Sequence, residues 1–180
     1  VEVEVRPVGE YEIERTPAAK LAMQKEWDCL RSKQVWDEDH PREWDEVRSD
    51  ARRGGGGYTV HMGYVYGTCV EKNAELDPSH RNFEGRVVFQ GNRVYDQDHN
   101  YAIFQDLGSS PSTLQAAKVV DFYGCLPGHC VEVVDVEQGF MQADMQRDPT
   151  WICLPLEARP EWWNKKFRHL RRPVCLLKKA

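Results

Sequence analysis

Two strand-like segments joined by a polar stretch constrain the fold most. Residues 58–70 are rich in aromatic and β-branched side chains, and residues 85–90 (Gly-Arg-Val-Val-Phe-Gln) repeat this character. The polar run 71–82 between them contains Asp77-Pro78, a dipeptide typical of turns. These segments are therefore predicted to form one long antiparallel hairpin.

Two helices are predicted before the hairpin. Thr16-Pro17 is a favourable helix start, and apolar residues then recur at helical spacing. These residues are Met23, Trp27 and Leu30. A second helix is expected to begin at His40-Pro41 and to end at Gly54 in a left-handed glycine cap. The run 54–57 lacks the Lys-Ser or Lys-Thr of a phosphate loop and is interpreted as a linker.

A third helix and a short strand are predicted after the hairpin. Ser110-Pro111 can start a helix that stops at Gly124. The apolar segment 130–134 is predicted to be a strand that carries Asp135 at its end. We expect a core that includes Met23, Trp27, Leu30, Val87, Phe89, Leu114, Val131 and Val133.

Composition limits the classes of protein that this chain can be. With 41% hydrophobic residues, the 180-residue chain has enough apolar side chain for a folded core, so disorder is not expected. No apolar run approaches the roughly 20 residues that cross a bilayer, and the first residues do not form a signal peptide. We therefore expect no membrane partner and an intracellular location, cytoplasmic or nuclear.

The cysteines indicate neither disulfides nor a metal site. Six cysteines are scattered without a C-x-x-C pair in a chain that has no secretion signal, so we expect thiols. Only Cys125, His129 and Cys130 cluster, and adjacent His and Cys side chains cannot easily share a tetrahedral zinc site with one further Cys.

Charge is distributed unevenly along the chain. Residues 162–180 contain seven Lys and Arg and no Asp or Glu, although the whole chain has a formal net charge of −5. Trp163, Phe167 and His169 lie among these basic residues and can offer stacking faces to nucleic acid. The alternative is an ordinary solvated surface. The candidate phosphate contacts are Lys165, Lys166, Arg168, Arg171 and Arg172.

Four segments, in order, resemble the reverse transcriptase (RNA-directed DNA polymerase) domain of copia-type retrotransposons. They are residues 22–27 (Ala-Met-Gln-Lys-Glu-Trp), 85–92 (Gly-Arg-Val-Val-Phe-Gln-Gly-Asn), 135–140 (Asp-Val-Glu-Gln-Gly-Phe) and 173–180 (Pro-Val-Cys-Leu-Leu-Lys-Lys-Ala). The resemblance covers roughly residues 16–180. It implies an α+β fold, comprising the fingers and part of the palm of a right-hand polymerase, with helices packed on an antiparallel sheet.

The resemblance also implies a division of the chain. Residues 1–15 would be a lead segment, residues 16–125 the helical pair and fingers, and residues 126–180 the start of the palm. The chain lacks an initiator Met, and its fourth segment resembles the lead-in to the family's Lys-Ala-Leu-Tyr-Gly element and stops as that element starts, so we expect the chain to be a portion of a polyprotein.

In the third segment the resemblance implies a catalytic metal site. Asp135 matches the first carboxylate that holds Mg²⁺, and the backbone carbonyl of Val136 touches the same ion. Gln138 and Gly139 match positions that line the triphosphate pocket, where the family usually has Ala instead of Gly139. Phe140 matches the aromatic residue beneath the incoming sugar, which selects deoxynucleotides. Without this resemblance, Asp135 would be an ordinary strand-end acid and Phe140 a core residue.

In the second segment the resemblance implies a grip on the incoming nucleotide. Arg86 matches the arginine that binds the triphosphate, and Arg81 is a candidate for a second positive charge. The family commonly has lysines just before this arginine, whereas residues 82–85 here are Asn-Phe-Glu-Gly, and Glu84 would repel phosphate.

The resemblance implies metal-dependent transfer of deoxynucleotides onto a primer. The partners would be an RNA or DNA template with its primer, deoxynucleoside triphosphates, and the rest of the polymerase and RNase H region of the polyprotein. The paired aspartates of a Tyr/Phe-x-Asp-Asp motif do not occur in these 180 residues, so we expect this chain alone to be inactive. The alternatives are a non-catalytic nucleic-acid-binding remnant and a scaffold without a nucleic-acid role.

Overall fold

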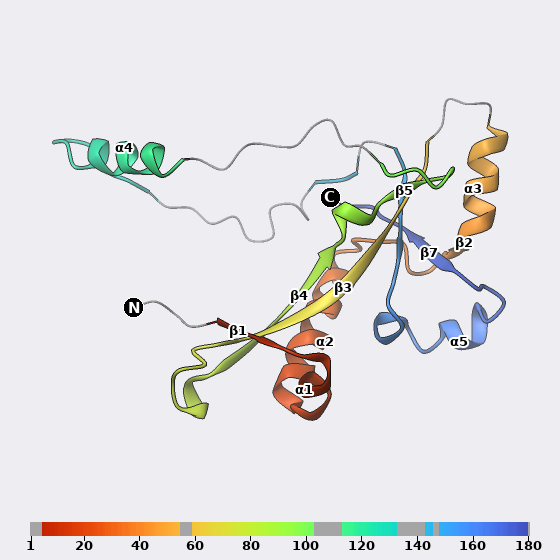
Figure 1. The fold of residues 1–180 in the computed structure, drawn as a ribbon, viewed down its shortest axis with the longest axis horizontal. Helices are drawn as coiled ribbons and strands as arrows, with labels where there is room; N and C mark the ends of the chain where they lie inside the picture. The colour runs from red at the N-terminus through yellow and green to blue at the C-terminus, as the bar shows by residue number, and fades with distance from the viewer. Residues whose placement is uncertain (1–4, 55–58, 103–112, 133–142, 146–147, 180) are drawn as a thin grey trace. The chain divides into compact units, whose positions relative to one another are not determined.

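The computed structural model describes residues 5–54, 59–102, 113–132, 143–145 and 148–179 (Figure 1). Contacts group the chain into two units, residues 1–102 with 140–180, and residues 103–139.

One long strand, β3 (His61–Lys72), organises the sheet of the first unit. Its second half pairs antiparallel with β4 (Asn82–Phe89) on one edge and with β1 (Val5–Val8) on the other. Its first half pairs antiparallel with β5 (Tyr95–Asp96) and parallel with β6 (Thr150–Cys153). The predicted hairpin is therefore confirmed as β3 and β4, which run in register from Val65↔Phe89 to Lys72↔Asn82.

The sheet continues beyond β6 through segments that are distant in sequence. β6 pairs antiparallel with β7 (Pro173–Leu176), and β7 pairs antiparallel with β2 (Arg42–Glu43). The expectation of a purely antiparallel sheet is wrong, because β3 and β6 run parallel. A parallel pair needs a long crossover, and about 80 residues separate these two strands. The described residues thus form a mixed α/β structure with a mixed sheet.

The predicted helix at residue 16 is confirmed as α2 (Pro17–Ser32), and it lies across the β3–β4 hairpin (Figure 1). Its C-terminus is closed by Gln34, which has a positive φ of 53°. The N–H of Val35 donates to the carbonyl of Leu30, and that of Gln34 donates to Arg31. Val35 and Leu30 also pack together in the core, which completes a Schellman motif.

Helix α3 (Trp44–Arg53) corresponds to the second predicted helix. It begins at Trp44, after the short strand β2, rather than at His40. The expected left-handed cap is wrong, since Gly54 has φ −70°. A short helix α1 (Glu10–Arg15) precedes α2 and was not predicted.

The central strands are buried on both faces, because their side chains alternate between two clusters. Ile152 and Cys175 pack with Trp27 and Leu30 of α2. The first cluster comprises Trp27, Leu30, Val35, Trp36, Val65, Ile152, Leu154, Ala158, Trp163 and Cys175. The second cluster comprises Trp44, Val47, Ala51, Val60, Met62, Trp151 and Val174. Helix α3 therefore covers the face opposite to α2.

The second unit contains α4 (Leu114–Gly124), which confirms a third helix that ends at Gly124. It begins at Leu114, and the predicted start at Ser110-Pro111 lies outside the described residues. Thr113 accepts a hydrogen bond from the N–H of Ala116 and caps its start. Leu114 and Val131 were expected in the core but are 68% and 42% exposed. Residues 130–132 of the predicted strand are not in a strand, and Val133 lies outside the described residues.

The remaining core expectations have mixed outcomes. Trp27 and Leu30 are buried, Met23 and Val87 are partly buried, and Phe89 is 37% exposed. Among the cysteines, Cys69 and Cys175 are buried and Cys125 and Cys130 are exposed. In the described parts of the chain, no helix is both long and apolar enough to span a bilayer.

Candidate nucleic-acid interface

The residues expected to hold Mg²⁺ and the nucleotide sugar lie outside the described residues. They are Asp135, Val136, Gln138, Gly139 and Phe140. In the described residues, no group of three or more His, Cys, Asp and Glu side chains is arranged to hold a metal ion.

Arg86, expected to grip triphosphate, lies on β4 and is engaged by an acid of the same strand. Its Nε and Nη2 donate to Glu84 Oε1 at 3.1 and 3.0 Å, and its side chain is 65% exposed. Glu84 also pairs with Lys72 of β3. Lys72 lowers the pKa of Glu84 most, and Arg86 lowers it further, against an opposing effect of partial burial. Arg86 is thus exposed but shares its charge with Glu84.

Arg81, the second expected phosphate contact, also interacts with groups of the same chain. Its Nε donates to the carbonyl of Leu76 at 2.8 Å, and its Nη1 lies 3.7 Å from Glu71 Oε1. Glu71 is a buried carboxylate that accepts a hydrogen bond from Arg6 Nε at 2.8 Å. Arg81 therefore fixes the loop after β3 and helps to neutralise a buried acid.

Gly85 explains why a bulkier residue cannot stand immediately before Arg86. A Cβ at this position would lie 2.7 Å from the Ala22 carbonyl oxygen and 2.9 Å from Met23 Cα. Both are backbone atoms of α2, so they cannot move aside cheaply. The close contact between α2 and β4 excludes a lysine at this position.

The basic segment, defined here as residues 162–172, is anchored at both ends. At its start, Trp163 of α5 (Trp163–Lys166) is buried, and its Nε1 donates to the carbonyl of Glu38 at 3.1 Å. At its end, the Glu43 carboxylate accepts hydrogen bonds from the backbone N–H groups of Arg171 and Arg172 at 2.7 to 3.1 Å. Strand β7 follows directly, so the segment is a loop of fixed path.

The cationic side chains of the basic segment project into solvent. All five candidates are exposed, and none forms an ion pair with another described residue. These residues are Lys165, Lys166, Arg168, Arg171 and Arg172. Their backbone is held by the core while their charges remain available, which is the arrangement needed to bind a polyanion.

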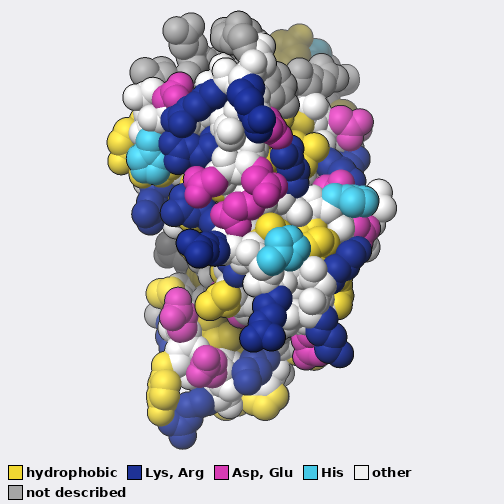
Figure 2. Space-filling model, turned by 90° about the vertical axis from the view of Figure 1, so that its right-hand side faces the viewer, with side chains coloured by type: hydrophobic (Ala, Val, Ile, Leu, Met, Phe, Trp, Pro, Cys, Tyr) yellow, Lys and Arg dark blue, Asp and Glu magenta, His cyan; other side chains and the backbone are white. Residues whose placement is uncertain are grey.

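Neighbouring basic residues on β2 and α3 differ because they form ion pairs. Figure 2 views the side on which α3 and α5 lie in Figure 1, and it shows Lys and Arg over much of this face with Asp and Glu among them. Arg42 and Arg53 both bind Asp50, at 2.5 and 2.7 Å, and Arg52 binds Asp98 at 2.9 Å. Among the described residues of β2, α3 and the basic segment, the cations that lack an acidic partner are those of the basic segment.

Aromatic side chains lie among the cations of the basic segment, but the exposed tryptophan is Trp162 and not the expected Trp163. Trp163 is 4% exposed and acts as an anchor, so its expected stacking role is wrong; the adjacent Trp162 is 38% exposed. Phe167 lies 5.7 Å from Trp162 and 6.5 Å from His169 between ring centroids. Lys166 Nζ lies 5.6 Å from the Trp162 ring centroid. Sequence reasoning could not decide which of two adjacent tryptophans is buried.

Comparisons of this chain with protein-family models, with curated proteins and with solved structures found no match.

Proposed function

We propose that this chain is the fingers and opening palm of an RNA-directed DNA polymerase of the copia-type retrotransposon class, and that it binds primer–template through the basic segment. The observation that carries the proposal is the set of five exposed cations on an anchored loop that form no ion pair with another described residue, beside an exposed tryptophan. Such a loop can neutralise phosphates and stack on a base. The order of the four polymerase-like segments in the sequence supports the enzymatic class.

In this proposal Asp135 and the carbonyl of Val136 would hold Mg²⁺, which would supply electrostatic stabilisation for phosphoryl transfer. Gln138 and Gly139 line the triphosphate pocket, and Phe140 excludes the ribose 2′ hydroxyl. Arg86 supplies charge from the fingers. The chain contributes one carboxylate of the metal site, so catalysis requires the paired aspartates that its sequence lacks.

Primer extension with Mg²⁺ tests the enzymatic proposal. We expect no extension by the 180-residue chain alone, and extension when the coding region is continued through a Tyr/Phe-x-Asp-Asp element. Asp135→Asn should abolish that activity, and Glu137→Gln, a neighbouring acid without an assigned role, should leave most of it. Extension that survives Asp135→Asn would refute the assignment of the metal site.

One observation favours a second candidate, a non-catalytic nucleic-acid-binding remnant. Both fingers arginines are engaged by acids of the chain, Arg86 by Glu84 and Arg81 by Glu71, which competes with triphosphate. Deoxynucleoside triphosphate binding by Glu84→Gln discriminates between the two. The polymerase proposal predicts that this variant binds nucleotide more tightly and that Arg86→Gln cancels the gain. A remnant predicts no nucleotide binding in either variant, with primer–template binding intact.

A further inference from the structure

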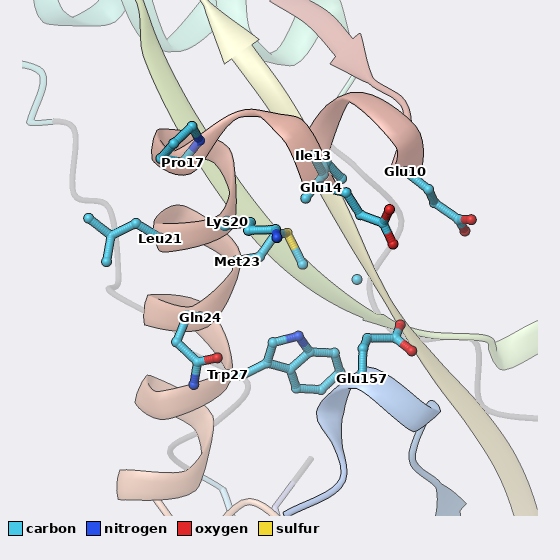
Figure 3. A pocket seen from close by; sticks show the side chains of 11 residues that line it. Glu10, Ile13, Glu14, Pro17, Lys20, Leu21, Met23, Gln24, Trp27 and Glu157 are labelled. Atoms are coloured by element: carbon cyan, nitrogen blue, oxygen red, sulfur yellow. The ribbon is translucent and has the colours of Figure 1, made fainter.

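A cavity of about 770 Å³ lies between α1, α2 and the short helix η4 (Leu156–Ala158) (Figure 3). Its floor is apolar and includes Met23 and Trp27 of α2. Gly67 of β3 completes the floor, and a Cβ there would lie 2.3 Å from Met23 Cε. The absence of a side chain at Gly67 therefore leaves room for Met23 and keeps the cavity deep.

The rim of the cavity is acidic. Glu10 and Glu14 of α1 and Glu157 of η4 contribute carboxylates, whereas Lys20 is the one basic residue among the described residues of the lining. Figure 3 shows these three glutamates on one side of the cavity. All three are exposed, and none forms an ion pair within the described part of the chain. The rim therefore attracts a cation.

Trp27 presents a hydrogen-bond donor to the same cavity. Its side chain is 4% exposed, and its Nε1 donates to no other described residue. In Figure 3 the nitrogen-bearing edge of the indole faces the cavity. Because this N–H borders the cavity, a ligand there could accept a hydrogen bond from it. The cavity thus combines a negative rim, an apolar floor and an indole donor that has no acceptor among the described residues.

We infer that this cavity binds a basic, partly apolar peptide segment of a protein partner. A Lys or Arg side chain of the peptide meets the glutamates, an apolar side chain covers Met23, and a backbone carbonyl accepts the Trp27 N–H. A metal ion or a polyamine would neutralise only the glutamates of the rim. A peptide supplies a cation, an apolar side chain and a carbonyl acceptor. This inference is independent of the proposed nucleic-acid function, since the rim would repel phosphate.

Fluorescence anisotropy with the full 180-residue chain tests the inference. The probe is a short fluorescein-labelled peptide of lysine, leucine and serine, and its counterpart has glutamate in place of lysine. We expect the lysine peptide to bind and the glutamate peptide not to bind. The double variant Glu14→Gln/Glu157→Gln should weaken binding about tenfold at low salt, at roughly threefold for each exposed ion pair. The matched control Glu46→Gln/Glu75→Gln changes net charge equally at exposed positions outside the cavity and should leave the affinity unchanged.

The donor role of Trp27 needs its own variant. Trp27→Phe retains a ring but removes the N–H, and we expect about fivefold weaker binding. A thermal melt checks that this variant is folded; if it is not, the glutamate variants decide alone. If Glu14→Gln/Glu157→Gln and the control Glu46→Gln/Glu75→Gln lose the same affinity, the peptide is attracted by the net charge of the chain and not by the cavity, and the inference is overturned. Absence of lysine-peptide binding by the unaltered chain would also overturn it.

Discussion

The contact between α2 and the β3–β4 hairpin can be tested by adding one methyl group at Gly85. A Cβ there would meet two backbone atoms of α2 at 2.7 and 2.9 Å, which is closer than real Cβ contacts come. Overpacking of this kind costs about 1–3 kcal/mol, and backbone atoms relax less than side chains do. We expect Gly85→Ala to lower the free energy of unfolding by about 2 kcal/mol. With a typical dependence on urea, the unfolding midpoint falls by roughly 1 M.

Gly91→Ala is the matched control, because a Cβ at Gly91 has no neighbour within 4 Å. This substitution removes the same conformational freedom from the unfolded chain, so its effect should be neutral or stabilising by up to about 1 kcal/mol. Urea unfolding followed by tryptophan fluorescence measures both variants. Equal stability of the two variants would refute the close contact between α2 and β4.

Three further predictions concern single side chains. The pKa of Glu84 is lowered by Lys72 and Arg86, so its ion pairs stabilise the fold above the ordinary glutamate range, and this stabilisation is lost as the pH falls through the lowered pKa. The stability difference between the unaltered chain and Glu84→Gln should therefore shrink as an acid titration passes below the ordinary glutamate range. Gln34→Gly should raise the thermal midpoint, since a left-handed non-glycine residue costs about 1 kcal/mol; an unchanged or lower midpoint would contradict this. Glu71→Gln should destabilise by about 2 kcal/mol in urea, because it weakens a buried, charge-assisted hydrogen bond from Arg6, whereas an effect below about 0.5 kcal/mol would mean the pair is dispensable.

Local patterns predicted the elements that depend on neighbours in sequence. The helical spacing of Met23, Trp27 and Leu30 gave α2, and two β-rich runs joined by a turn gave the β3–β4 hairpin. Both are confirmed because the interactions that form them are short-range, apart from packing on a common core.

Elements that depend on distant partners were missed. β6 and β7 are each four residues long, and their pairing joins segments far apart in the chain. Their continuous apolar sequences, such as Trp151-Ile152-Cys153, are typical of strands buried on both faces, but such runs do not identify a partner. Gly54 was expected to end α3 in a left-handed conformation and does not. The left-handed residue is Gln34 at the end of α2, where the following Val35 packs in the core.

The candidate site was predictable as a basic stretch, but not as an anchored loop. Charge counting identified Lys165 to Arg172, whereas the roles of Trp163 and Glu43 as anchors depend on tertiary contacts. Likewise, the sequence raised Glu84 as a repulsive neighbour of phosphate, and the structure shows that it binds Arg86 directly. Ion pairs of this kind, which depend on the folded structure, decide which cations remain available to bind phosphate.

The salt dependence of primer–template binding tests the central claim most directly. Each phosphate contact on a duplex contributes about 0.9 to the slope of log affinity against log salt. We predict that Arg168→Gln/Arg171→Gln reduces this slope by about two, whereas Lys25→Gln/Lys118→Gln, with the same charge change at exposed positions elsewhere, leaves it unchanged. A slope that is equal in all three proteins would contradict the assignment of the basic segment as the nucleic-acid interface.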